Sequence, residues 1–424
     1  MSPRHTHYDM IFLGGGCAAL SLLTRLLRSG QYATARILVI DRDSKKNNDR
    51  TWCFWEKGVG YFEDVVHRQW GQLDFFSAHF SSPLQLDGYR YKMIRGLDFY
   101  SYCLDLLERS GQVEWVEASL ADVSRTNDTL ILKGAPGSAA SQDLRAPGDS
   151  GSTFTWNLSA PLVFNSIYKP TVTSSKQVDL LQHFKGWVIE IPDSPTGDHG
   201  SRPAFDKDRA TLMDFRVSQH EGATFVYVMP LDERRALVEY TLFTPSLLRP
   251  ADYEEGLRQY IKEYLGITDY RVIEQEFGII PMSSQAFSFF EKGIFNLGTA
   301  GGQTKASSGY TFQFIQKQSE GIAARLLAIT KSGQVSRDVF VYEKALLSLK
   351  GGPSRFRFYD RVLLNVLAKG YWPGDQIFAR LFERNKAGKI FRFLDNESNI
   401  QEELAIISSL PTGPFLRGFA AGVY

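Results

Sequence analysis

The sequence predicts an α/β protein, in which a Rossmann-type dinucleotide-binding domain carries an inserted antiparallel-sheet domain and a helical C-terminal region. Three observations predict this class. Residues 9–41 read as strand, glycine loop, helix and strand. Residues 187–244 contain short β-like segments joined by loops, and the pattern after Val335 is mostly helical.

The N-terminal unit begins with a short apolar strand at residues 8–13, which runs directly into Gly14-Gly15-Gly16. Leucines then recur at helical spacing until Gly30, and residues 36–40 form a second apolar strand that ends on an acid. This is the order of elements in a nucleotide-binding βαβ unit.

Four positions of that unit have a physical role. Gly14 permits the tight turn, and Gly16 lets the backbone approach a pyrophosphate at the helix N-terminus. Ala19 stands where the third glycine usually packs the helix against the strand. Asp41 is placed to hold a ribose hydroxyl, which fits FAD and NAD equally well.

The composition excludes several classes of protein. The 424 residues are 43% hydrophobic and 22% charged, which is typical of a globular chain with a large core. The formal net charge of +1 gives no reason to expect nucleic acid as a partner. The spacing of the three cysteines and seven histidines predicts neither a metal site nor a disulfide framework and suits a reducing cytosol. No apolar run is long enough to span a bilayer, so any membrane contact is expected from the side.

The segment after the N-terminal unit alternates strands with one helix. An aromatic stretch at 47–56 precedes a helix at 97–110 and a third parallel strand at 113–116. The stretch 134–152 is rich in Gly, Ala, Ser, Pro and Asp, so we expect a long exposed loop there. Further strands are expected at 72–80, 89–94, 119–123, 129–133, 153–158 and 162–166.

The inserted sheet is expected to begin near residue 185. A hairpin turn is expected at 230–234 and an amphipathic helix at 253–265, after which Phe277–Pro281 leads the chain back to the nucleotide domain. The expected strands are 187–191, 210–217, 224–229 and 235–244.

A second glycine turn follows an apolar strand at 294–297. Gly298, Gly301 and Gly302 precede a helix that starts near Phe312. Such a turn fits one face of a flavin or its ribityl phosphate, and the alternative is an ordinary strand–helix turn.

The C-terminal region brings aromatic and basic residues together, as at 355–359 and 391–393. Helices of this composition can lie in a bilayer interface, and the alternative is a helical cap over the core.

The strand that points to chemistry is Ala236–Thr244, ALVEYTLFT. Period two puts Glu239 on one face with Leu237 and Phe243, and Tyr240 on the other. A carboxyl on an apolar face is costly when charged, so burial raises its pKa and favours a proton donor. The alternative is an edge-strand glutamate that reaches solvent or pairs with Arg216, Arg234 or Arg235. The sequence has no G-x-S-x-G, H-E-x-x-H or P-loop motif.

The chain resembles the FAD-dependent lycopene cyclases, a flavoprotein family related to geranylgeranyl reductases and aromatic hydroxylases. The resemblance covers nearly the whole chain, and its aromatic segment and VEYTLF strand are more specific than its glycine loop. It is carried by GGGCAALSL at 14–22, DRTWCFWE at 49–56, QHFKGW at 182–187, MDFR at 213–216, VEYTLF at 238–243, FGIIPM at 277–282 and GTAGGQTKASSGYTF at 298–312.

The resemblance implies cyclisation of the ψ-ends of lycopene to β-rings in carotenoid biosynthesis. This is an isomerisation without net redox change that uses reduced FAD, which NAD(P)H keeps reduced. A general acid protonates the terminal double bond, the carbocation closes a six-membered ring, and loss of a proton sets the ring double bond. The acid of the family motif Phe-Leu-Glu-Glu-Thr corresponds to Glu239. The substrate site implied around it comprises Trp52, Phe54, Trp55, Tyr240 and Thr241, whose aromatic members would face the cation.

Two positions depart from the family pattern. Tyr240 replaces the second glutamate of the motif. Thr299 replaces the aspartate of the Gly-Asp pair found in many related flavoproteins, so backbone groups at Gly301 and Gly302 would serve the ribityl chain instead.

We therefore expect a discontinuous FAD-binding domain, a substrate domain and a helical region that contacts the membrane. The expected location is the cytoplasm at the membrane surface, because the hydrocarbon substrate resides in the bilayer. Two other functions stay open, namely a flavin-dependent isoprenoid reductase or hydroxylase and a non-catalytic carotenoid or lipid carrier. The expected limits are 1–60, 85–170 and 277–335 for the FAD-binding domain, 61–84 and 171–276 for the substrate domain, and 336–424 for the helical region.

Overall fold

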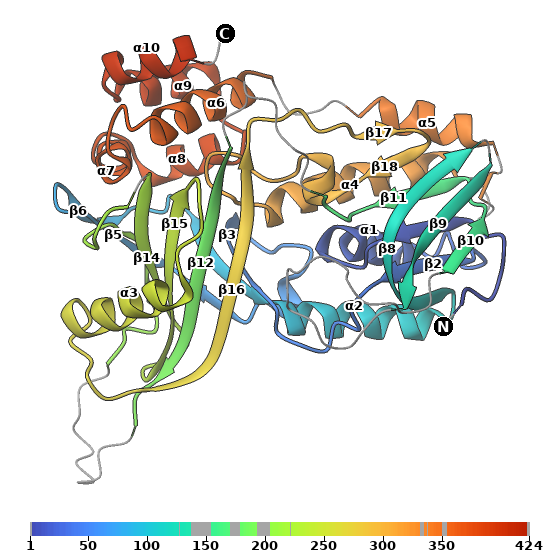
Figure 1. Cartoon of the computed structure of the whole chain (residues 1–424), viewed down its shortest axis with the longest axis horizontal. Coiled ribbons are helices and arrows are strands. Elements are labelled where there is room, and N and C mark those ends of the chain that lie inside the picture. Colours follow the sequence, from blue (N-terminus) through green and yellow to red (C-terminus); the bar gives the residue numbers. More distant parts are fainter. Residues whose placement is uncertain are drawn as a thin grey trace.

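A computed structural model gives the fold (Figure 1). The nucleotide domain occupies one side of the molecule, and the inserted sheet and the C-terminal helices occupy the other (Figure 1). The structure describes residues 2–126, 128–136, 154–169, 179–192, 204–220, 222–330, 335–336, 338–349 and 354–421.

The nucleotide domain is built on an eight-stranded sheet of order β10-β9-β8-β2-β1-β11-β18-β17. Its five central strands run parallel, which confirms the predicted βαβ unit and the third parallel strand. They are β8 (Val113–Thr126), β2 (Ile37–Asp41), β1 (Met10–Leu13), β11 (Leu162–Asn165) and β18 (Ile294–Asn296). β1 and β2 are buried along their whole length, as expected for strands covered on both faces.

Antiparallel strands finish both edges of this sheet. β9 (Thr129–Pro136) pairs with β8 and with β10 (Phe154–Leu158), and β17 (Phe290–Glu291) pairs with β18. The loop expected at 134–152 was therefore placed too early, because Gly134–Pro136 pair with residues 118–120 of β8. Residues 137–152 of that predicted loop lie outside the described residues.

Helices pack together against the central strands. α1 (Cys17–Arg28) contacts both α2 (Gly96–Ser110) and α4 (Phe312–Ile329), and α4 also contacts α5 (Val339–Leu347). Gly111 ends α2 in the left-handed conformation, as its position in the sequence predicted.

The inserted sheet has seven strands, of order β16-β12-β15-β14-β13-β5-β6. All neighbours are antiparallel except β13 and β5, and the predicted hairpin is confirmed between β14 and β15. Two strands are longer than the sequence suggested, since β12 starts at Asp179 and β16 extends over thirteen residues. The strands are β16 (Arg271–Ser283), β12 (Asp179–Glu190), β15 (Arg235–Thr244), β14 (Ala223–Pro230), β13 (Arg209–Asp214), β5 (Gln72–Phe76) and β6 (Ser81–Leu84).

The two faces of this sheet have different covers. Helix α3 (Pro250–Glu263) packs on one face, where Tyr253 and Leu257 meet Val238, Tyr240 and Leu242. A three-stranded sheet and the C-terminal helices cover the other face. That small sheet has the order β3 (Thr51–Lys57), β7 (Tyr89–Arg95), β4 (Arg68–Trp70).

Short helices, α6 to α10, end the described part of the chain and lie above the inserted sheet (Figure 1). None of the described helices is long and apolar enough to cross a bilayer. They are α6 (Ser354–Ala368), α7 (Gly374–Arg384), α8 (Ala387–Leu394), α9 (Ile400–Ser408) and α10 (Thr412–Ala421).

Candidate active site

The first glycine turn has the geometry that a pyrophosphate requires. Gly14 has φ +90°, and a Cβ there would lie 2.5 Å from Ser166 Oγ. Gly16 caps the N-terminus of α1, and a Cβ on it would meet no atom within 4 Å. The helix N-terminus therefore opens onto free space in which an anionic group can approach the backbone.

Asp41 lies at the end of β2 beside this turn. Its Oδ2 accepts a hydrogen bond from the Gly15 N–H at 2.6 Å, and its Oδ1 lies 3.1 Å from Lys45 Nζ. Ala19 is buried in the core between α1 and the sheet.

The second glycine turn touches the first. A Cβ on Gly298, which has φ +57°, would lie 2.7 Å from the Cβ of Ala18 in α1. Parallel strands β1 and β18 end at the same edge of the sheet, which is why two turns so distant in sequence meet. Gly301 and Gly302 line a cavity of about 440 Å³ between this turn, Phe287 and the C-terminal helices. The two turns and this cavity fit a dinucleotide that carries a bulky ring.

Sequence reasoning missed one residue of this region, Arg50. Its charge is close enough to the Cys17 thiol to lower that pKa, although burial dominates and raises the pKa to about 12. A guanidinium near the first residue of α1 suits a phosphate. The sequence did contain a signal for Arg50, because only a short loop separates this residue from Asp41 at the end of the second strand.

Two segments connect the glycine turns with the inserted sheet. The chain from Gly298 reaches Tyr310, whose hydroxyl lies 3.5 Å from that of Tyr227 on β14. Strand β3 follows Arg50 and carries Thr51, which donates a hydrogen bond to Glu276 Oε2 on β16 at 2.9 Å. The nucleotide turns and the sheet are thus parts of one site.

Glu239 lies in the middle of this sheet, between Tyr227 on β14 and Gly186 on β12. It is 8% exposed, and Thr241 Oγ1 donates a hydrogen bond to its Oε1 at 2.9 Å. Burial raises the pKa of this carboxyl well above its ordinary value, and the nearby charge of Glu276 raises it further.

The arginines that offered an alternative for Glu239 are engaged elsewhere. Arg216 pairs with Asp214 and Arg235 pairs with Asp232. The guanidinium of Arg234 donates to the carbonyl oxygen of Ile191. Among the described residues, Glu239 has no cationic partner, so the interpretation as a solvent-exposed or ion-paired glutamate is wrong.

The aromatic residues predicted around Glu239 separate into two groups, because side chains alternate along β3. Trp55 is buried on the side of the inserted sheet, stacks on Phe391 at 4.5 Å and meets the edge of Tyr310 at 4.5 Å. Trp52 and Phe54 lie on the opposite side, where both contact Phe312. The expectation that these two face the acid was therefore wrong.

Tyr240 also points away from the acid. It belongs to the cluster under α3, and a Cβ on Gly256 of that helix would lie 2.8 Å from its ring. Its neighbour Thr241 shares the face of Glu239 and contacts it directly. The prediction that Tyr240 lies beside the cation is therefore wrong, because side chains alternate between the two faces along β15.

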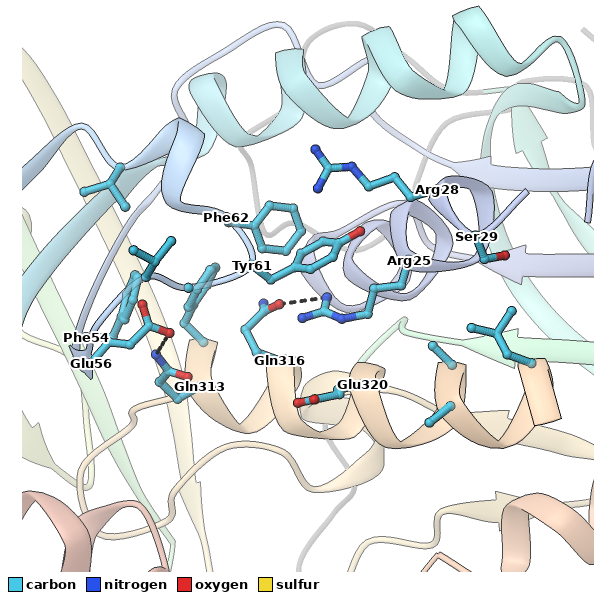
Figure 2. Close-up of a pocket in the computed structure, with 17 residues that line it drawn as sticks. Arg25, Arg28, Ser29, Phe54, Glu56, Tyr61, Phe62, Gln313, Gln316 and Glu320 are labelled. Carbon is cyan, nitrogen blue, oxygen red and sulfur yellow. Dashed lines mark hydrogen bonds between the residues drawn. The ribbon is translucent and has the colours of Figure 1, made fainter. Parts of the chain in front are cut away.

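A further cavity, of about 740 Å³, lies on the side of β3 that carries Phe54 (Figure 2). Arg25 lies 3.8 Å from the ring centroid of Tyr61 there and donates to Gln316 Oε1 at 3.1 Å (Figure 2). Its lining lacks Glu239, so this cavity is separate from the acid.

The site includes a second carboxyl that sequence reasoning missed. Glu276 on β16 and Glu239 on β15 are both paired in register with Gly186 of the intervening strand β12. The signal in the sequence was Gly186 of the QHFKGW segment, which lies opposite both acids. It indicates the acid pair only once the register of the three strands is known.

Comparison with known proteins agrees with this geometry. The family model described as "Lycopene cyclase protein" matches residues 9–419. The lycopene beta-cyclase of Pantoea ananas is 24% identical over 98% of both chains. That of Pseudescherichia vulneris is 23% identical over 74% of this chain and 73% of its own.

Similar solved structures are flavoproteins and related reductases. A geranylgeranyl bacteriochlorophyll reductase-like protein from Thermoplasma acidophilum has a TM-score of 0.64 at 13% identity, over 98% of this chain and 99% of that one. HpxO of Klebsiella pneumoniae, solved with FAD, has a TM-score of 0.59 at 13% identity, over 96% and 100%. The fold is that of FAD-dependent monooxygenases and reductases, as predicted. Because the family model spans nearly the whole sequence, the chain belongs to the lycopene cyclase family.

Proposed function

We propose that this protein is a lycopene β-cyclase, which closes the ψ-ends of lycopene to β-rings without net redox change. The observation that carries the proposal is the buried carboxyl of Glu239, which lacks a cationic partner among the described residues. An alkene is a weak base, so its protonation requires an acid that is kept neutral and away from water.

Glu239 donates a proton to the terminal double bond, and Thr241 fixes the carboxyl through its hydrogen bond to Oε1. Tyr91, Tyr227 and Tyr310 surround the site as neutral phenols, because burial raises the pKa of each. These rings and Trp55 present aromatic faces rather than ions, which stabilises a carbocation without capturing it.

FAD fits the two glycine turns. Gly14, Gly16 and Arg50 would hold its pyrophosphate, and Asp41 its ribose. The ring would be held at the second turn, where Gly301 and Gly302 line the cavity and Gly298 meets α1. Bound and kept reduced by NAD(P)H, FAD would supply an electron-rich ring that stabilises the cation.

A second candidate function is a flavin-dependent isoprenoid reductase or hydroxylase. This alternative is supported by the similarity in fold to the reductase-like protein from Thermoplasma acidophilum. Product mass separates the candidates, since cyclisation leaves the mass unchanged, reduction adds hydrogen and hydroxylation adds oxygen.

We also propose that the protein takes its substrate from a membrane surface through α9 and α10. Ile400, Leu404 and Ile407 lie on one face of α9 and are 64%, 61% and 42% exposed. Leu416 and Phe419 on α10 are 59% and 44% exposed. Exposed basic residues on α6, directly after it and on α10 suit anionic lipid headgroups, namely Arg357, Arg361, Lys369 and Arg417.

The test is conversion of lycopene by purified protein with reduced FAD, followed by absorption spectrum and product mass. The unchanged protein is expected to give cyclic products of the same mass as lycopene. Glu239→Gln is expected to retain FAD and to lose at least about 100-fold in rate, the scale of general acid catalysis. Full activity of this variant would remove Glu239 as the acid.

A further inference from the structure

The carboxyls of Glu239 and Glu276 face each other across a glycine. Both residues are in register with Gly186, so the side chains lie on the same face of β15 and β16. A Cβ on Gly186 would lie 2.9 Å from Glu276 Cγ and 3.1 Å from Leu237 Cδ1. The absence of a side chain at Gly186 therefore provides the space in which the two acids approach each other.

Glu276 has the properties of a proton acceptor. Its Oε2 accepts a hydrogen bond from Thr51, whereas its Oε1 is buried and has no hydrogen-bond partner among the described residues. A buried carboxyl oxygen without a donor is costly, so its persistence requires an explanation. Burial raises the pKa of Glu276, but the proximity of the two acids favours keeping the proton on Glu239.

No cation faces the pair within the described part of the chain. The groups that influence it electrostatically are acids, neutral phenols and one thiol. Asp49 precedes β3 and Cys53 lies on it, whereas Tyr227 lies on β14 and Glu274 on β16. Tyr310 follows the second glycine turn. Two close carboxyls in such a setting hold one proton between them.

We propose that Glu276 is the catalytic base of the cyclisation and shares one proton with Glu239. This inference rests on the proposed function. Glu239 gives its proton to the less substituted carbon of the terminal double bond, whose π electrons form the new C–H bond and leave the cation on the other carbon. The π electrons of the next double bond of the ψ-end then form the carbon–carbon bond that closes the ring, which moves the cationic centre into the ring. Glu276 then takes a proton from the ring carbon next to the cationic centre, and the electrons of that C–H bond become the ring double bond. Transfer of this proton from Glu276 to Glu239 restores the starting state, so protons balance and no redox partner is consumed.

The rate of cyclisation should have a bell-shaped dependence on pH, because turnover needs Glu276 ionised and Glu239 protonated. As pH falls, Glu276 becomes protonated and the rate decreases. As pH rises, Glu239 ionises and the rate decreases again. The decrease of the rate at acidic pH results from protonation of Glu276. Replacing Glu276 should therefore abolish this decrease, which a packing defect would not do.

The experiment compares Glu276→Gln with Glu274→Gln, an exposed acid two residues earlier on the same strand, in FAD-loaded protein with lycopene. Glu276→Gln is expected to retain FAD, to lose at least about 100-fold in rate and to lose the acidic limb. Glu274→Gln should keep the rate and the acidic limb, and that limb should move to lower pH because the charge of Glu274 raises the pKa of Glu276. An unchanged rate and pH profile in Glu276→Gln would overturn the inference. If Glu239→Gln is inactive in the same assay, the proposed function still stands although Glu276 is not the base. Absence of cyclic product from the unchanged protein would instead reject the proposed function.

A second variant covers the case in which Glu276→Gln does not fold. Glu276→Asp keeps a carboxylate but shortens its reach, so a reduced rate with both limbs of the pH profile is expected. An aspartate variant without an acidic limb would contradict the assignment of Glu276 as the base.

Discussion

Two buried acids of the inserted sheet, Asp214 and Glu239, have opposite surroundings. Asp214 on β13 is fully buried, lies 2.6 Å from Arg216 Nη2 and accepts a hydrogen bond from Tyr260 at 2.8 Å. Glu239 on β15 is buried almost as deeply, and its hydrogen bond from Thr241 comes without a cation among the described residues.

The difference teaches how to separate a structural acid from a chemical one. Burial is common to both, and only the compensation of the charge differs. Asp214 has a guanidinium and a phenol as its hydrogen-bond donors, so we assign it to the stabilisation of the fold. Around Glu239 the fold places phenols and a second carboxyl instead, and its raised pKa is what the proposed role as a proton donor requires.

Removing each acid is expected to separate stability from activity. Asp214→Ala leaves Arg216 and Tyr260 without their acceptor and should lower the free energy of unfolding by about 3 kcal/mol. At a pH below the unfolded pKa of about 4.3, where Glu239 is protonated in both states, Glu239→Gln should change it by less than about 1 kcal/mol, and the variant should lose cyclisation. Urea unfolding and lycopene conversion measure both quantities. A large loss of stability in Glu239→Gln would place this residue with the structural acids.

Substitution at Gly186 tests whether the approach of the two acids needs the glycine. Gly186→Ala puts a methyl group 3.0 Å from Glu276 Oε1 and should cost about 1–3 kcal/mol of stability through overpacking. The rate should fall further than stability predicts, because the carboxyls are pushed apart. Gly256→Ala, which crowds Tyr240 on the other face of the sheet, is the matched control and should reduce stability with little change in the rate per folded molecule.

The pH dependence of stability should report the raised pKa of Glu239. A pKa raised in the folded state contributes stability that is fully present below the unfolded value near 4.3 and is lost as pH rises through the folded value. Each unit of elevation corresponds to about 1.4 kcal/mol. Glu239→Gln should therefore become more stable relative to the unchanged protein as pH increases from 5 to 8. A difference that is independent of pH would contradict a raised pKa.

The smallest effect is expected from the outer helices, and it separates supply of substrate from chemistry at the buried acid. Leu404→Ser with Leu416→Ser should weaken binding to vesicles that contain anionic lipid, because about 60% of each leucine is exposed. Activity on lycopene dispersed in detergent should be unchanged, whereas Glu239→Gln loses activity in both assays. Unchanged vesicle binding, measured by flotation, would place the membrane contact elsewhere.

The parts of the fold that could be predicted were those set by local pattern. The unit around Gly14 and Asp41 was readable because its strand, turn and helix follow each other without interruption. The face that Glu239 shares with Leu237 and Phe243 followed from period two along β15, whereas the burial of both faces of this strand depends on tertiary packing. The last three residues of β9 were missed because pairing with β8 overrides the turn-forming composition of Gly134–Pro136.

The remaining site residues depend on pairing between distant strands. Glu276 escaped notice because β16 opens with RVIEQE at 271–276, where two apolar residues are followed by three polar ones and no alternation is clear. Its position opposite Glu239 also depends on the pairing of both strands with β12. Trp52 and Phe54 were misplaced for a related reason. Alternation along β3 could be read from the sequence, but which face meets the inserted sheet is decided by tertiary packing.

The most direct test of the central claim is the protonation state of Glu239 itself. An infrared difference spectrum between the unchanged protein and Glu239→Gln at neutral pH isolates the absorption of this one carboxyl. A neutral carboxylic acid C=O band is the predicted result, and it should disappear in the variant. A band of ionised carboxylate at that pH, with no neutral acid, would contradict the account.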